Sequence, residues 1–361
     1  MPKIPLVDVK AQYASLIPEL ERRFRDVLDG GQFILGPNVH AFEREAAEYL
    51  GVPDAIGVAN GTDALVLVLD ALGIGPGDEV ICPAFTFYAT AEAIARRGAT
   101  PVFADVDPAT FNIDPEDVAA RITERTRAIM PVHLFGRLAP LAELAQIGPP
   151  LVEDAAQAFG APGVARTGIA STFSFFPTKN LFGLGDGGLV TANDADIGER
   201  VRLLRFHGSK DKKDFTALGY NSRLDELQAA MLRVFLAKID EWNAQRREAA
   251  ARYAELGLGD LVEIPEDDPA HVYHLFVCRS PERDRIVAAL QEAEIGCATY
   301  YLPPLHLQPA LRFLGYEEGS LPETEQLSRE NFSVPLWAGI SGEQQERVVD
   351  VVRSAVGARV A

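Results

Sequence analysis

Short apolar runs alternate with helical patterns over residues 55–195, and this alternation constrains the fold more than any other feature of the chain. Each run is rich in β-branched residues and ends in a turn signal, as strands do. Strands joined through helices run in the same direction, which predicts a mostly parallel seven-stranded sheet covered on both faces. We expect strands at Ala55–Ala59, Glu79–Cys82, Pro101–Asp105, Arg127–Val132, Leu151–Glu153, Thr172–Phe176 and Gly188–Thr191, with helices at Asp63–Leu72, Ala89–Arg97, Pro115–Ile122 and Leu138–Gln146.

The segments on either side of this region have different patterns. A helical arm is predicted over residues 14–50, broken by Gly30-Gly31 and Gly36-Pro37. One long helix is predicted over Leu224–Ala254, because its apolar residues keep to one stripe. The remainder mixes a helix at Arg283–Glu292 with strands at His271–Cys278 and Cys297–Tyr301. We therefore expect two domains: residues 1–250, with the arm and the large domain, and residues 251–361, a smaller α+β domain.

Composition excludes several classes of function. The 361 residues are 47% hydrophobic, enough for a full core, and the formal charge of −18 disfavours nucleic acid or an anionic membrane as partner. No apolar run approaches the roughly 20 residues that cross a bilayer. Three widely spaced cysteines fit a reducing cytoplasm rather than a disulfide framework, and the six histidines lack ligand spacing, so no metal site is expected.

Lys179 is the residue that first suggests a reaction. The chain has seven lysines among its 34 basic residues, and Lys179 is alone between Lys10 and Lys210. It lies in Ser-Phe-Phe-Pro-Thr-Lys-Asn-Leu (174–181), among aromatic and apolar residues. A desolvated lysine supplies a neutral amine for Schiff-base chemistry, whereas an ordinary lysine beside a strand extends its ammonium to water. The segment by itself leaves both interpretations open.

Polar residues that follow the predicted strands favour the first interpretation, because ligands of such sheets bind at the carboxyl ends of the strands. Asp154 follows a buried strand, where a carboxylate can pair with a protonated ring nitrogen, and Gln157 can bond a ring oxygen. The alternative is that Asp154 only caps a helix. Phe87 is a candidate for stacking on a flat ring, although an aromatic residue there is commonly part of the core.

A phosphate site is predicted where the first strand turns into a helix. Gly61 allows backbone N–H groups to approach an anion, Thr62 offers a hydroxyl at the helix start, and Ser174 offers a second one. Asn-Gly-Thr is also an ordinary turn. Together, a lysine, an acid, a phosphate cradle and a stacking ring match what pyridoxal phosphate (PLP) requires. A nicotinamide dehydrogenase is disfavoured, because the chain lacks GxGxxG after a strand.

The chain also resembles the DegT/DnrJ/StrS family of PLP-dependent nucleotide-sugar aminotransferases over nearly its whole length. The segments that carry the resemblance are Gly-Gln-Phe-Ile-Leu-Gly-Pro (31–37), Asn-Gly-Thr-Asp-Ala-Leu (60–65), Gly-Pro-Gly-Asp-Glu-Val (75–80), Glu-Asp-Ala-Ala-Gln-Ala (153–158), Phe-Pro-Thr-Lys-Asn-Leu (176–181), Gly-Tyr-Asn-Ser-Arg-Leu-Asp-Glu-Leu-Gln-Ala (219–229) and Pro-Leu-His-Leu-Gln (304–308).

The resemblance implies the aspartate-aminotransferase-like fold (PLP fold type I) and assigns roles to residues. Lys179 would carry PLP as a Schiff base, and the other residues proposed above would hold its ring and phosphate. Asn221 would reach the phosphate from the neighbouring subunit, which implies a homodimer with shared active sites. Arg223 and His306 would lie near the sugar nucleotide, although Arg223 could equally be an ion-pair residue.

The resemblance also predicts the reaction. Family members with lysine at position 179 transaminate, whereas those with histidine dehydrate. We expect L-glutamate as donor and a nucleotide-linked keto-sugar as acceptor, in amino-sugar biosynthesis for glycans or natural products. Gly-Asp-Gly-Gly (185–188) favours a 3-keto over a 4-keto sugar; a PLP-binding regulator without turnover is a further alternative. Phe159, a short 161–171 segment and an unusual loop before Gly219 depart from the family pattern and are expected to touch the substrate pocket.

Overall fold

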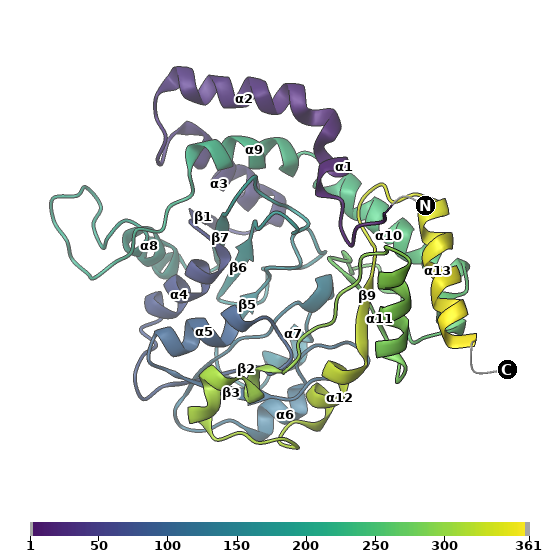
Figure 1. Ribbon diagram of the computed structural model, residues 1–361. Coiled ribbons are helices and arrows are strands. Elements are labelled where there is room, and N and C mark those ends of the chain that lie inside the picture. The colour runs from purple at the N-terminus through teal and green to yellow at the C-terminus, as the bar shows by residue number, and fades with distance from the viewer. Residues whose placement is uncertain (1–2, 358–361) are drawn as a thin grey trace.

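The computed structural model describes residues 3–357, and its centre is a β-sheet (Figure 1). Hydrogen-bonded ladders give the strand orders β1-β7-β6-β5 and β3-β2-β4, and parallel bridges at Ile129–Leu151 and Val132–Asp154 join them. Within residues 3–357 the seven strands therefore run in the order β3-β2-β4-β5-β6-β7-β1, with only β7 antiparallel to its neighbours. The strands are β1 (Asp54–Val58), β2 (Glu79–Pro83), β3 (Thr100–Ala104), β4 (Thr126–Ile129), β5 (Val152–Asp154), β6 (Ala170–Ser174) and β7 (Gly188–Ala192).

Helices cover both faces of this sheet, and successive strand residues point to opposite faces. On β1 and β7, Ile56 and Val190 pack in one cluster with the helices α4, α5 and α8, whereas Ala55 and Leu189 pack in another with α3 and α9. Two short helices, α6 and α7, cover a third cluster beside β2 and β4. These helices are α3 (Pro37–Leu50), α4 (Gly61–Ala71), α5 (Tyr88–Arg96), α6 (Pro115–Ala120), α7 (Leu141–Leu144), α8 (Ala195–Leu204) and α9 (Glu226–Leu236).

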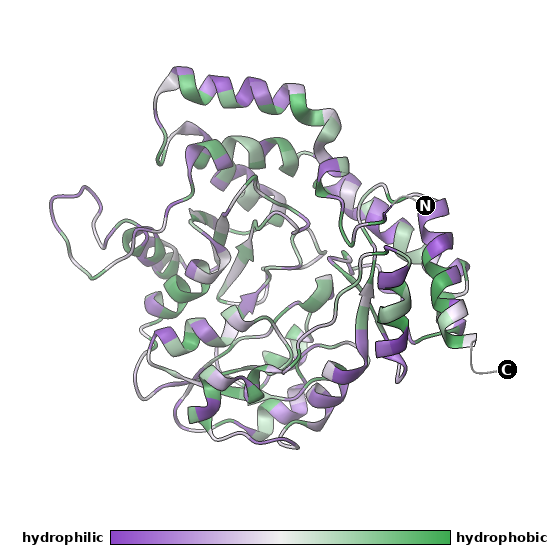
Figure 2. Ribbon diagram, in the orientation of Figure 1, coloured by the Kyte–Doolittle hydropathy of each residue, from purple (hydrophilic) through white to green (hydrophobic). Residues whose placement is uncertain are grey.

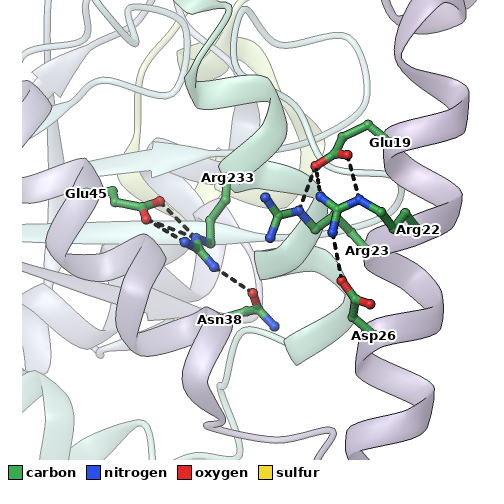
Figure 3. Close-up of polar contacts among 7 residues, drawn as sticks. All are labelled: Glu19, Arg22, Arg23, Asp26, Asn38, Glu45 and Arg233. Carbon is green, nitrogen blue, oxygen red and sulfur yellow. Dashed lines mark hydrogen bonds and ion pairs between the residues drawn. The ribbon is translucent and has the colours of Figure 1, made fainter.

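The N-terminal arm packs across the outer side of α9. It consists of α1 (Val9–Tyr13), η1 (Ala14–Leu16) and α2 (Ile17–Gly30), and Gly31 ends α2 in the left-handed conformation. Beneath the arm, Arg233 connects α9 to α3 by hydrogen bonds of 2.8–3.0 Å to Glu45 and 2.8 Å to Asn38, both on α3 (Figure 3). Phe24 and Leu28 of α2 are about half exposed, so this helix leaves apolar surface uncovered.

The C-terminal part builds its own core around a two-stranded antiparallel sheet. Its elements are α10 (Ile239–Glu255), η3 (Leu258–Asp260), β8 (Phe276–Arg279), α11 (Arg283–Glu292), η4 (Leu305–Leu307), η5 (Pro309–Leu314), α12 (Pro322–Glu330), β9 (Asn331–Val334) and α13 (Gly342–Gly357). In Figure 2, α11 and α13 show hydrophilic and hydrophobic residues along their length, as amphipathic helices do. Leu305, Leu311 and Leu321 pack instead against the α4 side of the large sheet. The division at residue 250 stays a prediction.

The single long helix predicted over Leu224–Ala254 is wrong, because α9 and α10 are separate. The chain turns at Ala237 and Lys238, and Lys238 has φ −113° and ψ −6°. This turn lets Trp242 stack on Phe182, with ring centroids 5.7 Å apart, while Phe182 also stacks on Phe235 at 4.7 Å. Aromatic rings of α9 and α10 thus pack on Phe182 across the break, which the apolar stripe in the sequence does not reveal.

The two strands predicted in the C-terminal part are only partly correct. The first is confined to Phe276–Arg279, because Tyr273 has a positive φ of 42° and residues 271–275 follow an irregular path. The second is reduced to a single bridge between Ala298 and Ser333. The irregular stretch has a consequence for the site, since it carries His274 and Leu275 to the wall of the central cavity.

Candidate active site

A cavity of about 540 Å³ opens at the carboxyl ends of β1, β5 and β6. Strands that run in parallel end at the same edge of the sheet, so the residues that follow them meet there. Tyr300 and Tyr301 line another side, and Leu6 and Val7 of the N-terminal segment complete the wall. Seven of the eight residues predicted to bind or react with a cofactor line this cavity: Gly61, Thr62, Phe87, Asp154, Gln157, Ser174 and Lys179.

Lys179 reaches the cavity through a tight turn after β6, in which its backbone N–H donates to the Phe176 carbonyl at 2.8 Å. Burial lowers the pKa of Lys179 from 10.5 to about 8, and the attraction of Asp154 opposes this shift. An appreciable fraction of this lysine is therefore a neutral amine near neutral pH. Desolvation of this amine agrees with the first of the two interpretations of the sequence, and the role of Lys179 as nucleophile stays a prediction.

Asp154 ends β5 and is 5% exposed. Its Oδ2 accepts a hydrogen bond from the Thr90 hydroxyl at 2.9 Å, and its Oδ1 accepts one from the Ala156 backbone N–H at 3.2 Å. Burial raises the pKa of Asp154; the Thr90 and Ala156 hydrogen bonds and the nearby Lys179 act in the opposite direction. A carboxylate offers about four acceptor positions, so lone pairs remain for a donor in the cavity.

The amide orientation of Gln157 is fixed by a hydrogen bond from a backbone N–H of the loop after β4. Its Oε1 accepts a hydrogen bond of 2.7 Å from the Phe135 backbone N–H, and Phe135 has a positive φ of 57°. Because a backbone N–H can only donate, the amide nitrogen must face the other way, where it lies 3.4 Å from the Tyr301 hydroxyl. Gln157 therefore presents a hydrogen-bond donor to the cavity, as recognition of a ring oxygen requires.

The start of α4 forms an anion cradle. The first N–H groups of a helix have no partner within it, and Asn60 caps the helix by accepting from Asp63 N–H at 2.8 Å. Gly61 is required here, since a Cβ at this position would lie 2.7 Å from Cβ of Ser174.

Phe87, the residue before α5, is 60% exposed and lines the cavity. Its ring is available to stack on a flat ligand.

Three predicted residues lie elsewhere. Asn221 and Arg223 line a second cavity of about 320 Å³, and Asp186 lines both cavities. His306 is buried, with Nε2 3.1 Å from Oε1 of Glu325. It packs beside Tyr316 and is not among the residues that line the Lys179 cavity. The substrate roles of Arg223 and His306 stay predictions.

Phe159 was expected to touch the substrate pocket and does not. It is 4% exposed, stacks on Tyr49 with centroids 5.7 Å apart, and packs edge-on against Phe173 in the core under α3 and α9. Its aromatic ring fills space between the sheet and these helices. This departure from the family pattern therefore concerns core packing rather than substrate choice.

Sequence analysis also missed residues that the fold brings to the cavity. His274 is 4% exposed, and burial, then Lys179 and Arg246, hold its pKa well below the usual range, so this imidazole is neutral. Tyr301 and Thr90 hold Gln157 and Asp154, respectively. None of these three residues left a signal in the sequence, because each contact depends on how distant elements pack.

These groups fit PLP. Lys179 can bind its aldehyde carbon, Asp154 its ring nitrogen and Gln157 its ring oxygen, while the cradle that a Cβ at Gly61 would fill suits its phosphate. Among residues 3–357, no group of three or more His, Cys, Asp or Glu side chains is placed to hold a metal ion. A desolvated lysine, a buried carboxylate and an anion-binding helix start on a mostly parallel sheet are the features of a PLP-dependent enzyme of fold type I.

Comparison with known proteins identifies the family. The family model for the DegT/DnrJ/EryC1/StrS aminotransferase family matches residues 15–353. The chain is 48% identical to the "Pleiotropic regulatory protein" of Geobacillus stearothermophilus over 97% of each chain. It is 43% identical to the "dTDP-3-amino-3,4,6-trideoxy-alpha-D-glucose transaminase" of Streptomyces venezuelae, over 98% of this chain and 96% of the relative. The chain belongs to the DegT/DnrJ/EryC1/StrS aminotransferase family.

Solved structures agree in fold. S. venezuelae DesV, in complex with a ketimine intermediate, superposes with a TM-score of 0.94 at 42% identity over 98% of both chains. NtdA from Bacillus subtilis, with bound cofactor PMP, superposes with a TM-score of 0.93 at 30% identity over 99% of this chain and 86% of that one. In residues 3–357, no helix combines the length and apolarity needed to span a bilayer.

Proposed function

We propose that the protein transfers an amino group from L-glutamate to a nucleotide-linked 3-keto sugar, as a cytoplasmic homodimer that makes an amino sugar. The observation that carries the proposal is the cavity in which Lys179 meets Asp154, Gln157 and the α4 cradle. The choice of substrate is supported by relatives of 42–43% identity named for 3-amino or 3-dehydro sugars linked to dTDP or UDP. The three free cysteines support the cytoplasmic location.

Lys179 has two tasks in this proposal. It would anchor the cofactor, and its Nζ, when neutral, would take the proton from the α-carbon of the donor. The cofactor supplies an electron sink that stabilises the negative charge left on that carbon. With the keto-sugar bound, Nζ returns a proton to the sugar carbon that receives the amine.

Other residues orient the reacting groups. The Asp154 carboxylate keeps a proton on the ring nitrogen, and Gln157 donates to the ring oxygen. Phe87 stacks on the ring face. The N–H groups at the start of α4, with the hydroxyls of Thr62 and Ser174, hold the phosphate.

The homodimer is supported by the second cavity. Asn221 does not line the Lys179 cavity of its own chain, so its predicted contact with the cofactor phosphate would come from a neighbouring copy, and Arg223 lines the same second cavity. Ile34 lines this second cavity at 40% exposure, and Phe33 beside it is 45% exposed. Apolar side chains around an open polar cavity suit burial against a second copy of the chain.

Two measurements test the proposal. The purified protein is incubated with L-glutamate and a panel of dTDP- and UDP-linked 3-keto and 4-keto sugars, and amino-sugar products are detected by mass. A 3-amino product is expected, and a 4-amino product would assign the other acceptor class. Lys179→Ala should lose both the Schiff-base absorbance and all turnover; a Lys179→Ala variant with full turnover would refute the assignment of Lys179.

A PLP-binding regulator without turnover is the second candidate. It is favoured by the name of the 48% identical relative, a pleiotropic regulatory protein. Addition of L-glutamate separates the two functions, because an aminotransferase loses the Schiff-base band as it converts the cofactor. A band that persists under saturating glutamate and every other amino acid tried would favour the regulator.

A further inference from the structure

The segment from the end of β2 to the first turn of α5 carries two threonine hydroxyls beside the cofactor cavity. Thr86 precedes Phe87, and Thr90 lies in the first turn of α5, with its backbone N–H bonded to the Phe87 carbonyl at 3.3 Å. Both threonines are at most 1% exposed. Their hydroxyl oxygens are 3.3 Å apart, and the Thr90 hydroxyl lies 2.9 Å from Oδ2 of Asp154. Two buried hydroxyls therefore connect in a line to the carboxylate.

The direction of this line follows from the charge at its end. An ionised carboxylate can only accept, so Thr90 donates to Asp154, and Thr86 must then donate to the Thr90 oxygen. Within residues 3–357, Thr90 is the one side chain that donates a hydrogen bond to Asp154; the other donor is the Ala156 backbone. A hydrogen bond to the charged form of an acid stabilises that form.

We propose that Thr90 is a positioning residue that keeps Asp154 ionised and oriented toward the ring nitrogen of the cofactor, with Thr86 as its relay. The inference rests on the proposed role of Asp154. Without the hydroxyl, a carboxylate of 5% exposure keeps only the 3.2 Å bond from Ala156. The neutral form of Asp154 then persists to a higher pH than in the wild type. A neutral acid no longer supports a protonated ring nitrogen.

The other charged and titratable groups around Asp154 do not replace Thr90. Lys179 faces it from the turn after β6, but the attraction of this lysine does not overcome the effect of burial, which raises the pKa of Asp154. His133, after β4, bonds the Glu153 carboxylate through Nε2 at 2.9 Å and accepts from Ala139 N–H at 3.0 Å through Nδ1. The Cys82 thiol and the Tyr301 phenol are neutral, because burial raises the pKa of each.

The test measures binding rather than turnover. Full-length protein stripped of cofactor is titrated calorimetrically with pyridoxamine 5'-phosphate (PMP) between pH 5.5 and 8. PMP forms no Schiff base, so the protonation state of Lys179 affects PMP binding only through the charge of this lysine. Thr90→Val removes the hydroxyl and keeps the shape, whereas Thr90→Ser keeps the hydroxyl. Thr191→Val is the matched control, since Thr191 is buried in β7 and its hydroxyl has no partner within residues 3–357.

For Thr90→Val, the dissociation constant of PMP relative to wild type should rise as the pH falls. The fall of PMP affinity at low pH, here called the acid limb, should therefore move upward by about one to two pH units. Thr90→Ser and Thr191→Val should follow wild type, and Thr86→Val should shift less than Thr90→Val. A ratio that stays constant with pH, or a Thr90→Ser variant as weak as Thr90→Val, would overturn the proposal.

Asp154→Asn separates failure of this proposal from failure of the role given to Asp154. This variant should bind PMP weakly at every pH. Its affinity should lack the acid limb that Thr90→Val moves to higher pH. If Asp154→Asn retains the wild-type acid limb, the role of Asp154 is wrong. If Asp154→Asn loses the limb but Thr90→Val leaves it in place, Thr90 has only a structural role. Circular dichroism of each variant establishes that it is folded before titration.

Discussion

Replacement of Lys179 by methionine should stabilise the cofactor-free protein. The pKa of this lysine falls from 10.5 to about 8 in the fold, because its charge is buried. At about 1.4 kcal/mol per pH unit, the folded protein carries a penalty of about 3 kcal/mol when Lys179 is charged. Methionine has similar length and no charge, so Lys179→Met should raise the free energy of unfolding by up to about 3 kcal/mol at pH 7.

The sign of the pH dependence distinguishes this cause from improved packing. The unfolded chain keeps its proton on Lys179 up to pH 10.5, whereas the folded chain releases it near pH 8. The penalty is therefore complete below pH 8 and disappears as the pH rises from 8 to 10.5. The advantage of Lys179→Met should shrink over the same range, whereas any gain from packing methionine would not change with pH.

Urea unfolding of cofactor-free wild type and Lys179→Met, at equal protein concentration and at several pH values between 7 and 10.5, measures this difference. Cofactor must be absent, since binding would stabilise the wild type by mass action. Lys210→Met is the control, because the Lys210 side chain is 79% exposed and should change stability by less than about 0.5 kcal/mol. Equal stability of Lys179→Met and wild type at pH 7, or a difference constant with pH, would refute the reasoning.

Two further predictions concern the cradle and His306. Gly61→Ala should weaken PLP binding by about tenfold or more in equilibrium dialysis, because its Cβ would lie 2.7 Å from Cβ of Ser174. Gly30→Ala, with open space around the added methyl, should bind normally, and tight binding by Gly61→Ala would exclude the cradle. Glu325→Ala should lower the free energy of unfolding by about 1–3 kcal/mol, since it removes the acceptor for buried His306 and for Gly319 N–H. PLP affinity should stay unchanged; a large loss of affinity with unchanged stability would instead connect His306 to the site.

The elements of the large domain were predictable because their signals are local. A strand has a period of two residues and a helix a period of 3.6, so the seven strands were expected to within a few residues of their observed bounds. The rule that ligands bind at the carboxyl ends of parallel strands then predicts that Asp154 and Lys179 lie close together. Both residues line the observed cavity.

The sequence by itself thus determined the fold class and the cofactor, and it predicted the lysine that would bind this cofactor, since each follows from residue types at short spacings. Only the tertiary structure decided which distant side chains meet. It separated α9 from α10 through the packing of Phe182 and Trp242, buried His306 against Glu325, and brought Thr90 to Asp154. Thr90 and Asp154 are 64 residues apart, and their contact depends on the relative placement of β2, α5 and β5. Contacts of this kind are set by the packing of whole elements, for which a local pattern carries no signal.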